Sequence, residues 1–382
     1  MHAALLQHAP QPLGASTEPR CASTLNAMQN GEWVTTTICD TNTTMRHPMC
    51  TAEGQVWRPR DGCSLRLFNG TDACELLRAN GGLIILGDSI QRHFYQGLIN
   101  VLSEDYELGS LASSHHDEHR EILPAHHHDK APSPLLPGTH EQENETTAAT
   151  LQPLDECTGE AQYDEKSCRF PRDLDRQPLP GCGGSDVAQL LQLWQVRSWW
   201  EGALGWVAKV RRVRDRGGTI VAGGGIHDGF DSSKYGRVLH HLATQVLTHP
   251  PCNEHARNEH AASHHDTSNS TSSAQRCPMV IWMSMHSQLE SLKPEQYRED
   301  QSNQVVLSFN AEMARNAADE TTRLHGALKV FDTFNVTSGA RSFDGTHHGR
   351  AVSVLKAQLL LNLIDESRRP KRGVSRGRVQ RL

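Results

Sequence analysis

Two short motifs, far apart in the chain, contain the residue types of serine chemistry. Ser89 follows an apolar run, Leu83 to Leu86, that ends in Gly87. A serine between a buried strand and a helix exposes its hydroxyl at the sheet edge, where the first N–H groups of the helix can stabilise a developing oxyanion. Asp and Ser are also among the best helix N-caps. The tripeptide alone therefore leaves a nucleophile and an N-cap both open.

The second motif precedes the last helical pattern and offers a base. Asp344 and His347 stand three residues apart in the run Phe343-Asp-Gly-Thr-His-His. A nucleophilic serine needs a base, and the base needs a group that orients it. A capping Asp beside two exposed histidines is the alternative, in a chain with 23 His. The joint arrangement of Ser89 at a strand end and D-x-x-H before the last helix favours catalysis.

Alternating strand and helix patterns predict how these motifs are positioned. Short apolar runs indicate strands, and apolar residues at helical spacing indicate helices. Such units predict an α/β fold, a three-layer sandwich with a parallel sheet, whose ligands bind beyond the carboxyl ends of the strands. The predicted strands are 83–86, 219–222, 279–283 and 328–331, and the predicted helices are 90–102, 187–213, 232–247, 304–324 and 351–364.

Composition divides the chain into segments. Of its 382 residues 36% are hydrophobic, which is enough for a sizeable core but requires long loops. We expect a disordered lead (1–20), a cysteine-rich segment (21–80), an α/β domain (81–365) with insertions at about 110–185 and 252–276, and a basic tail (366–382). The net charge of -6 argues against nucleic-acid binding, and no apolar stretch is long enough to span a membrane.

Clustered histidines raise the possibility of a metal site. His115, His116 and His119, and the run 126–128, have spacings that could bind zinc on a helix. Two nearby prolines, Pro124 and Pro132, and the low-complexity context favour a solvated insertion instead. We therefore expect no metal.

Cysteines and sequons bear on the compartment. Ten cysteines, none in a C-x-x-C pair, accompany five Asn-x-Ser/Thr sequons, at Asn42, Asn69, Asn144, Asn269 and Asn335. This combination favours the secretory pathway, in the Golgi lumen or outside the cell. Residues 1–8 contain no apolar core, so no signal peptide is visible. Either the chain begins downstream of its true start, or the protein is intracellular with reduced cysteines.

Four motifs in order resemble a known family. They are 87–92 (Gly-Asp-Ser-Ile-Gln-Arg) with Asp344-x-x-His347, the upstream segments 30–34 and 56–65, and Ala-Cys-Glu-Leu-Leu at 73–77. Together they resemble the PC-esterase branch of the SGNH hydrolase superfamily, over roughly residues 21–105 and 217–365. That branch includes trichome-birefringence-like polysaccharide O-acetyltransferases and the luminal domains of sialate or capsule O-acetyltransferases.

The resemblance implies a role for each matching catalytic residue. Ser89 would be the nucleophile, His347 its general base and Asp344 the group that orients the base. Arg92 matches the family's arginine one turn after the serine, on the same helical face, and is an oxyanion or substrate-binding candidate whose guanidinium would reach an acyl oxygen or an acidic sugar. A surface arginine paired with Asp88 or Glu104 is the alternative for Arg92.

The oxyanion position departs from the superfamily pattern. Gly225-Ile-His-Asp occupies the place of G-x-N-D, with His227 where the asparagine would donate a hydrogen bond. An imidazole N–H can also donate, so His227 can serve as an oxyanion or substrate-binding residue. Gly225 can equally be present for close approach of the backbone.

The implied function is O-acetyl transfer to, or removal from, the hydroxyls of a carbohydrate or polysaccharide substrate. No bound cofactor is expected; acetyl-CoA or a partner protein would supply the acyl group. A rival interpretation is a catalytically inactive protein of the SGNH fold that binds glycans or acts as an interaction protein of the secretory pathway. His227 and the long insertions favour the rival, whereas Ser89, Asp344 and His347 argue against it.

Overall fold

A computed structural model describes residues 18–39, 47–111, 157–164, 171–201, 203–247, 277–324 and 328–369. Five parallel strands form its main sheet, in the order β4-β3-β5-β6-β7. The predicted α/β fold with a parallel sheet is therefore confirmed. The strands are β3 (Leu83–Gly87), β4 (Ala188–Gln192), β5 (Thr219–Ala222), β6 (Met279–Met283) and β7 (Leu328–Phe331). Every residue of β3, β5 and β6 is buried, as expected of apolar runs in a covered parallel sheet.

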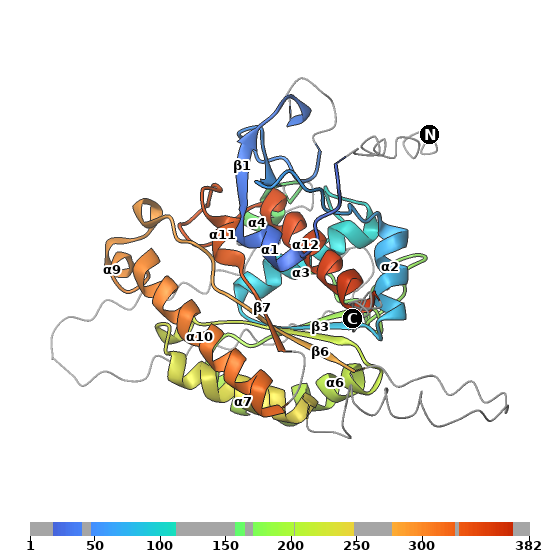
Figure 1. Cartoon of the computed structure of the whole chain (residues 1–382), viewed down its shortest axis with the longest axis vertical. Helices are drawn as coiled ribbons and strands as arrows, with labels where there is room; N and C mark the ends of the chain where they lie inside the picture. The colour runs from blue at the N-terminus through green and yellow to red at the C-terminus, as the bar shows by residue number, and fades with distance from the viewer. Residues whose placement is uncertain are drawn as a thin grey trace, which may run out of the picture.

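The long helices lie on either side of these strands (Figure 1). One group contains α2 (Gly70–Ala79), α3 (Ser89–Ser103) and α12 (Arg350–Arg368). The other contains α6 (Ala203–Asp215), α7 (Ser232–Leu247) and α10 (Asn303–Leu324). The shorter helices are α1 (Thr24–Gln29), η1 (Thr37–Cys39), α4 (Ala161–Asp164), α5 (Val196–Glu201), η5 (Ile226–Asp228), η6 (Glu290–Leu292), α9 (Glu295–Arg298) and α11 (Thr333–Thr337). In the described part of the chain, no helix has both the length and the apolar character needed to cross a membrane.

The strand order indicates where on the sheet a ligand site is expected, beside β3. In chain order the sheet reads second, first, third, fourth, fifth, so its winding direction reverses at β3. β3 pairs with β4 on one side and with β5 on the other. In sheets of this kind, ligands bind where the direction reverses, outside the carboxyl ends of the strands. Ser89 lies two residues beyond the end of β3, and Gly225 three residues beyond the end of β5.

Disulfides hold the N-terminal segment. Its strands β1 (Gly31–Thr35) and β2 (Gln55–Pro59) pair antiparallel. Cys21–Cys63 and Cys39–Cys50 close loops within the segment. Cys74–Cys182 links α2 to the chain that leads into β4. The expected cysteine-rich segment is thus disulfide-bonded, and one bond extends beyond it.

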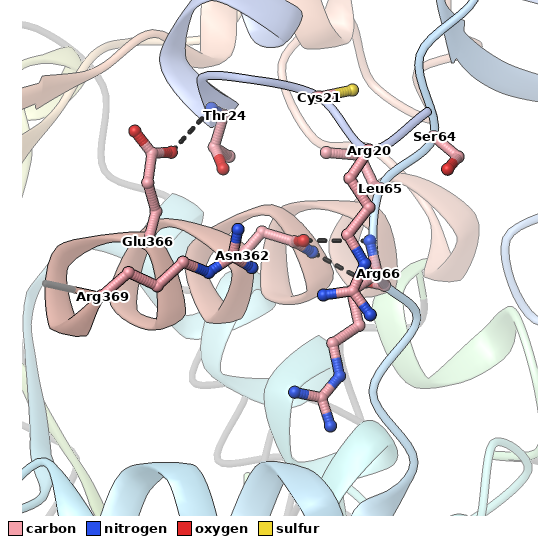
Figure 2. Close-up of a pocket in the computed structure, with 9 residues that line it drawn as sticks. All are labelled: Arg20, Cys21, Thr24, Ser64, Leu65, Arg66, Asn362, Glu366 and Arg369. Carbon is pink, nitrogen blue, oxygen red and sulfur yellow. Dashed lines mark hydrogen bonds between the residues drawn. The ribbon is translucent and has the colours of Figure 1, made fainter. Parts of the chain in front are cut away.

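Polar contacts attach this segment to α12, as Figure 2 shows. The Thr24 backbone N–H donates to the Glu366 carboxylate at 2.8 Å. The Asn362 side chain accepts from the Arg66 N–H at 3.0 Å and donates to the Arg66 carbonyl at 2.8 Å. Arg20 and Arg369 also line the small pocket between these groups. The pocket lies by the C-terminal half of α12, whereas His347 precedes its N-terminus.

Two elements differ from the sequence-based expectation. The predicted helix over 187–213 is wrong in its first part, because residues 188–192 form β4 and helices begin only at Val196. Leu190, Leu191 and Trp194 fit a helical spacing, but pairing with β3 decides the conformation. Helix α2 was not anticipated, although Asn69 caps it by accepting from the Asp72 N–H.

The remaining differences concern boundaries. The closing helix, expected over 351–364, extends to Arg368 and so enters the expected tail. Most of the expected insertion at 110–185 lies outside the described residues, but Tyr163 and Cys182 within it are buried. The insertion at 252–276, the lead up to residue 17 and the tail from residue 370 also lie outside the described ranges.

Helices α3 and α12 approach each other closely at one glycine. A Cβ at Gly97 would overlap the backbone carbonyl of Ser353. The surrounding side chains Phe94, Leu98, Val354 and Leu359 are fully or almost fully buried. No side chain larger than hydrogen therefore fits between the two backbones at this point.

Gly97→Ala should destabilise the fold, because the added methyl group forces the helices apart in a packed core. We expect a loss of about 1–3 kcal/mol in the free energy of unfolding, measured in urea. Gly205→Ala on α6 is the matched control, since a Cβ there meets no atom within 4 Å. Removing a helical glycine at that position should leave stability unchanged or raise it by up to about 1 kcal/mol. Equal effects of the two substitutions would contradict the close approach.

Non-reducing peptide mapping of the protein from its native source should recover three linked pairs: Cys21–Cys63, Cys39–Cys50 and Cys74–Cys182. Reduction should destabilise the fold, since loss of a native disulfide typically costs about 2–5 kcal/mol in small secreted domains. The same six cysteines found as free thiols in native protein would overturn the bonded arrangement.

Candidate active site

The structure brings together the two ends of the expected triad. Ser89 Oγ lies 2.6 Å from His347 Nε2, across 258 positions of sequence. Ser89 is the first residue of α3 and is 4% exposed. The N-cap of α3 is Asp88, whose carboxylate accepts from the Ile90 N–H, and Gln91 completes a capping box. The hydroxyl of Ser89 therefore faces the imidazole instead of capping the helix.

Asp344 holds the other side of the imidazole. Its Oδ2 lies 2.7 Å from His347 Nδ1, and its Oδ1 accepts from the N–H groups of Thr346 and His347 at 3.0 and 2.9 Å. A carboxylate only accepts, so Nδ1 carries the proton and Nε2 is left to accept from the Ser89 hydroxyl. This is the tautomer that a general base needs.

Hydrogen bonds keep Asp344 ionised. Partial burial opposes the charged form, but the His347 ring and the two backbone N–H groups outweigh it. The pKa of Asp344 therefore lies well below its usual range. A carboxylate at neutral pH can orient the ring and would stabilise an imidazolium at His347 if the ring took a proton.

The turn between Asp344 and His347 is held by its own backbone conformation and by side chains of the loop that follows β6. Gly345 has a φ of 89°, in the left-handed region that favours glycine. The next residue, Thr346, accepts from Lys293 Nζ at 2.6 Å and donates to Gln288 Oε1 at 2.9 Å. Burial lowers the pKa of Lys293 to about 8, although Asp344 and Glu290 oppose the shift. The loop that follows β6 thus anchors the turn that carries the base.

His348 and His286 lie behind the base. His348 Nδ1 donates to the Arg341 carbonyl at 2.9 Å, and the residue is 2% exposed. His286 is 1% exposed, with Nε2 3.0 Å from the buried Lys356 Nζ. The position of His286 just past the strand that ends at Met283 predicts from the sequence that it lines the cleft, but the structure buries it.

Arg92 is part of the buried surroundings of Ser89. It is 3% exposed, and its Nη2 donates to His93 Nε2 at 3.0 Å. Its guanidinium lies over the ring of Trp194, 6.0 Å from the ring centre. The alternative of a surface arginine is therefore wrong, and Arg92 stands one turn from Ser89 on the same helix.

The two oxyanion candidates lie one strand away. Gly225 follows β5, and its carbonyl accepts from the Asp228 and Phe230 N–H groups. His227 is exposed in η5 and packs edge-on against Trp194, with ring centres 5.4 Å apart. Neither residue takes part in the hydrogen bonds that join Ser89, His347 and Asp344. Both lie beyond the end of β5 and are not part of the triad.

Trp194 was missed by the sequence analysis as a site residue. It follows β4, where the Leu193 N–H donates to the Gly87 carbonyl at 2.7 Å, next to the turn that carries Ser89. Its ring joins Arg92 and His227, which come from two other elements. Recognising residues 188–192 as a strand would have placed Trp194 at a strand end, where site residues gather. The histidine runs at 115–119 and 126–128 lie outside the described residues.

Asp88 gives the site a testable electrostatic signature. It is fully buried, and its Oδ2 has no hydrogen-bond partner among the described residues. Burial raises the pKa of Asp88 from 3.8 to about 7, although the Ile90 N–H and Arg92 favour the charged form. At pH values between 3.8 and about 7, Asp88 keeps its proton in the folded protein and loses it in the unfolded chain. Folding stability should therefore fall as pH rises from about 4 to about 7.

Asp88→Asn should remove this part of the pH dependence, because an amide does not titrate and Asn caps helices as well as Asp. Urea unfolding across this pH range measures it: the variant should gain stability relative to the unchanged protein as pH rises, and the gain should level off above about pH 7. A constant difference between the two proteins at all pH values would show that Asp88 titrates normally.

Comparison of the chain with protein-family models, with curated proteins and with solved structures found no match. The site is therefore interpreted from its own geometry: a buried serine, a hydrogen-bonded imidazole and an ionised carboxylate at the carboxyl edge of a parallel sheet.

Proposed function

We propose that the protein carries out acyl-ester chemistry through a Ser-His-Asp triad. The observation that supports this is the hydrogen-bonded chain Ser89–His347–Asp344, with distances of 2.6 and 2.7 Å. An N-cap and two exposed histidines, the alternative for these motifs, would not require the three side chains to meet. These three hydrogen-bonded side chains lie beside β3, where the winding direction of the sheet reverses. Ligands of such sheets bind at this point, outside the carboxyl ends of the strands.

The proposed reaction has two steps. Ser89 Oγ attacks the acyl carbonyl carbon while His347 Nε2 takes its proton; His347 then gives the proton to the departing group, leaving an acyl-serine. In the second step, His347 removes a proton from a hydroxyl that attacks the acyl-serine and returns it to Ser89 Oγ. The backbone N–H of Ser89 is at the start of α3, without an intrahelical partner, and suits the oxyanion.

The acceptor and donor follow from the family resemblance. We propose an SGNH-like three-layer sandwich whose acceptor is a carbohydrate hydroxyl, or water in the hydrolytic case. The acyl group, an acetyl group in the simplest case, would come from acetyl-CoA or from an acyl-donating partner protein. We propose that Arg92 on α3, Trp194 after β4 and His227 after β5, which are joined by ring contacts at Trp194, contact these substrates.

We also propose a secretory compartment. The three disulfides are compatible with an oxidising lumen or an extracellular location. Two of the sequon asparagines, Asn69 and Asn335, are exposed in the structure. Their accessibility is compatible with glycosylation there.

Labelling with a fluorophosphonate probe and hydrolysis of p-nitrophenyl acetate test the triad. Ser89→Ala should abolish both, because no other hydroxyl lies against His347 Nε2 among the described residues. His347→Ala should be nearly as severe, and Asp344→Asn should reduce the rate on the order of 10³ to 10⁴-fold by misdirecting the ring. Far-UV circular dichroism should remain unchanged.

His240→Ala is the matched control for loss of a histidine. His240 is exposed on α7 and pairs with Glu320 at 2.8 Å, so its loss should leave turnover within about twofold. His348→Ala cannot serve as this control, because the His348 ring is buried. If Ser89→Ala labels and turns over like the unchanged protein, the triad is not catalytic, and a glycan-binding protein becomes the better interpretation.

A further inference from the structure

One buried histidine touches the base and is not used in the proposed reaction. His93 stands one turn after Ser89 on α3 and is 2% exposed. Its ring centre lies 4.9 Å from that of His347, with the two planes inclined by 38°. On the other side, its ring meets Tyr163 edge-on at 5.7 Å. His93 therefore forms part of the wall against which the catalytic imidazole rests.

Two separate partners require the same tautomer of His93. Arg92 Nη2 lies 3.0 Å from His93 Nε2, and a guanidinium only donates, so Nε2 must accept. The His348 carbonyl lies 3.4 Å from His93 Nδ1, and a carbonyl only accepts, so Nδ1 must donate. The Arg92 contact alone would fix the ring as neutral with its proton on Nδ1, and the His348 contact requires a proton on the same nitrogen. Their agreement makes the ring a rigid link between Arg92 and the residue that follows His347.

The charges around His93 favour the same state. His93 faces Arg92 on its own helix, His347 on the loop before α12 and Lys356 on α12 itself. Burial, and then these positive or ionisable groups, hold the pKa of His93 well below its usual value, although the His348 carbonyl opposes the shift. A neutral ring can stay beside His347 without repelling the imidazolium that the reaction forms.

We propose that His93 is a positioning residue for the base: Arg92 fixes its tautomer, and its Nδ1–H and ring hold the His347–His348 segment against Ser89. The proposal rests on the proposed function for its kinetic part. It also gives Arg92 a role, because the guanidinium acts on His347 through His93. A displacement of about 1 Å at the base is enough to cost about 10²-fold in rate.

Paired amide variants separate the two contacts of His93. An Asn amide N–H lies near the place of Nδ1 and can still donate to the His348 carbonyl, whereas a Gln side chain reaches the place of Nε2 and meets Arg92. We expect His93→Asn to keep kcat for p-nitrophenyl acetate within about tenfold, and His93→Gln to lower it about 10²-fold. KM should change by less than about threefold in both. His240→Asn and His240→Gln, at the exposed α7 position, should match the unchanged protein.

Equal losses in His93→Asn and His93→Gln, each matched by an equal loss of stability in urea, would show a merely structural role and overturn the proposal. A rise in KM with kcat unchanged would also overturn it, since a positioning residue acts on the base and not on substrate affinity.

NMR of the unchanged protein with ¹⁵N-labelled histidine tests the proposal without any activity. The His93 ring should be neutral with its proton on Nδ1 at neutral pH, and His93→Gln should shift the His347 ring nitrogens more than His93→Asn does. A protonated ring, or one with its proton on Nε2, would refute the positioning role whatever the enzyme does. If instead the NMR result holds but Ser89→Ala retains full turnover, the proposed function fails while the structural link stands.

Discussion

The contact between α3 and α12 at Gly97 is the constraint on which the site depends. Ser89 begins α3, and His347 lies three residues before α12 begins, so the separation of these helices sets the distance between hydroxyl and imidazole. Because a Cβ at Gly97 would overlap the Ser353 backbone, the two helices meet backbone to backbone at this point. Residues 258 positions apart can therefore come within 2.6 Å without a long loop reaching between them.

Three of the histidines around the site share one protonation pattern. His93, His347 and His348 each have a carbonyl or carboxylate at Nδ1, and His286 has the Lys356 amine at Nε2. The three oxygen partners require a proton on Nδ1 of His93, His347 and His348 when these rings are neutral. Burial lowers the pKa of His348 to about 4 and holds that of His286 well below its usual value. The charge formed during the proposed reaction is thus confined to His347, the ring that has a carboxylate partner.

Much of this arrangement could be predicted from the chain, for a definite physical reason. Short apolar runs such as 83–86 and 279–283 are buried on both faces, so local pattern and tertiary structure agree there. At β4 they disagree: the mixed run Ala-Gln-Leu-Leu-Gln fits a helix as well as an edge strand, and pairing with β3 decides. Because β4 was not predicted as a strand, Trp194 was not recognised as a residue at a strand end. His93 was missed because its role depends on contacts with Arg92 and His348, and the latter lies 255 positions away.

The exposure of the triad bears on the choice between transfer and hydrolysis. Ser89 is 4% exposed, the side chain of His347 15% and that of Asp344 48%. Water therefore reaches the carboxylate end of the hydrogen-bonded chain while the nucleophile is covered. An acyl-serine formed at Ser89 would be attacked by whichever hydroxyl reaches His347 Nε2, and this nitrogen faces the covered end of the hydrogen-bonded chain, not the exposed carboxylate. In the proposed transfer reaction, the cover over Ser89 therefore limits the access of water to the acyl-serine, and a sugar would gain access through its affinity for the surface around Arg92, Trp194 and His227.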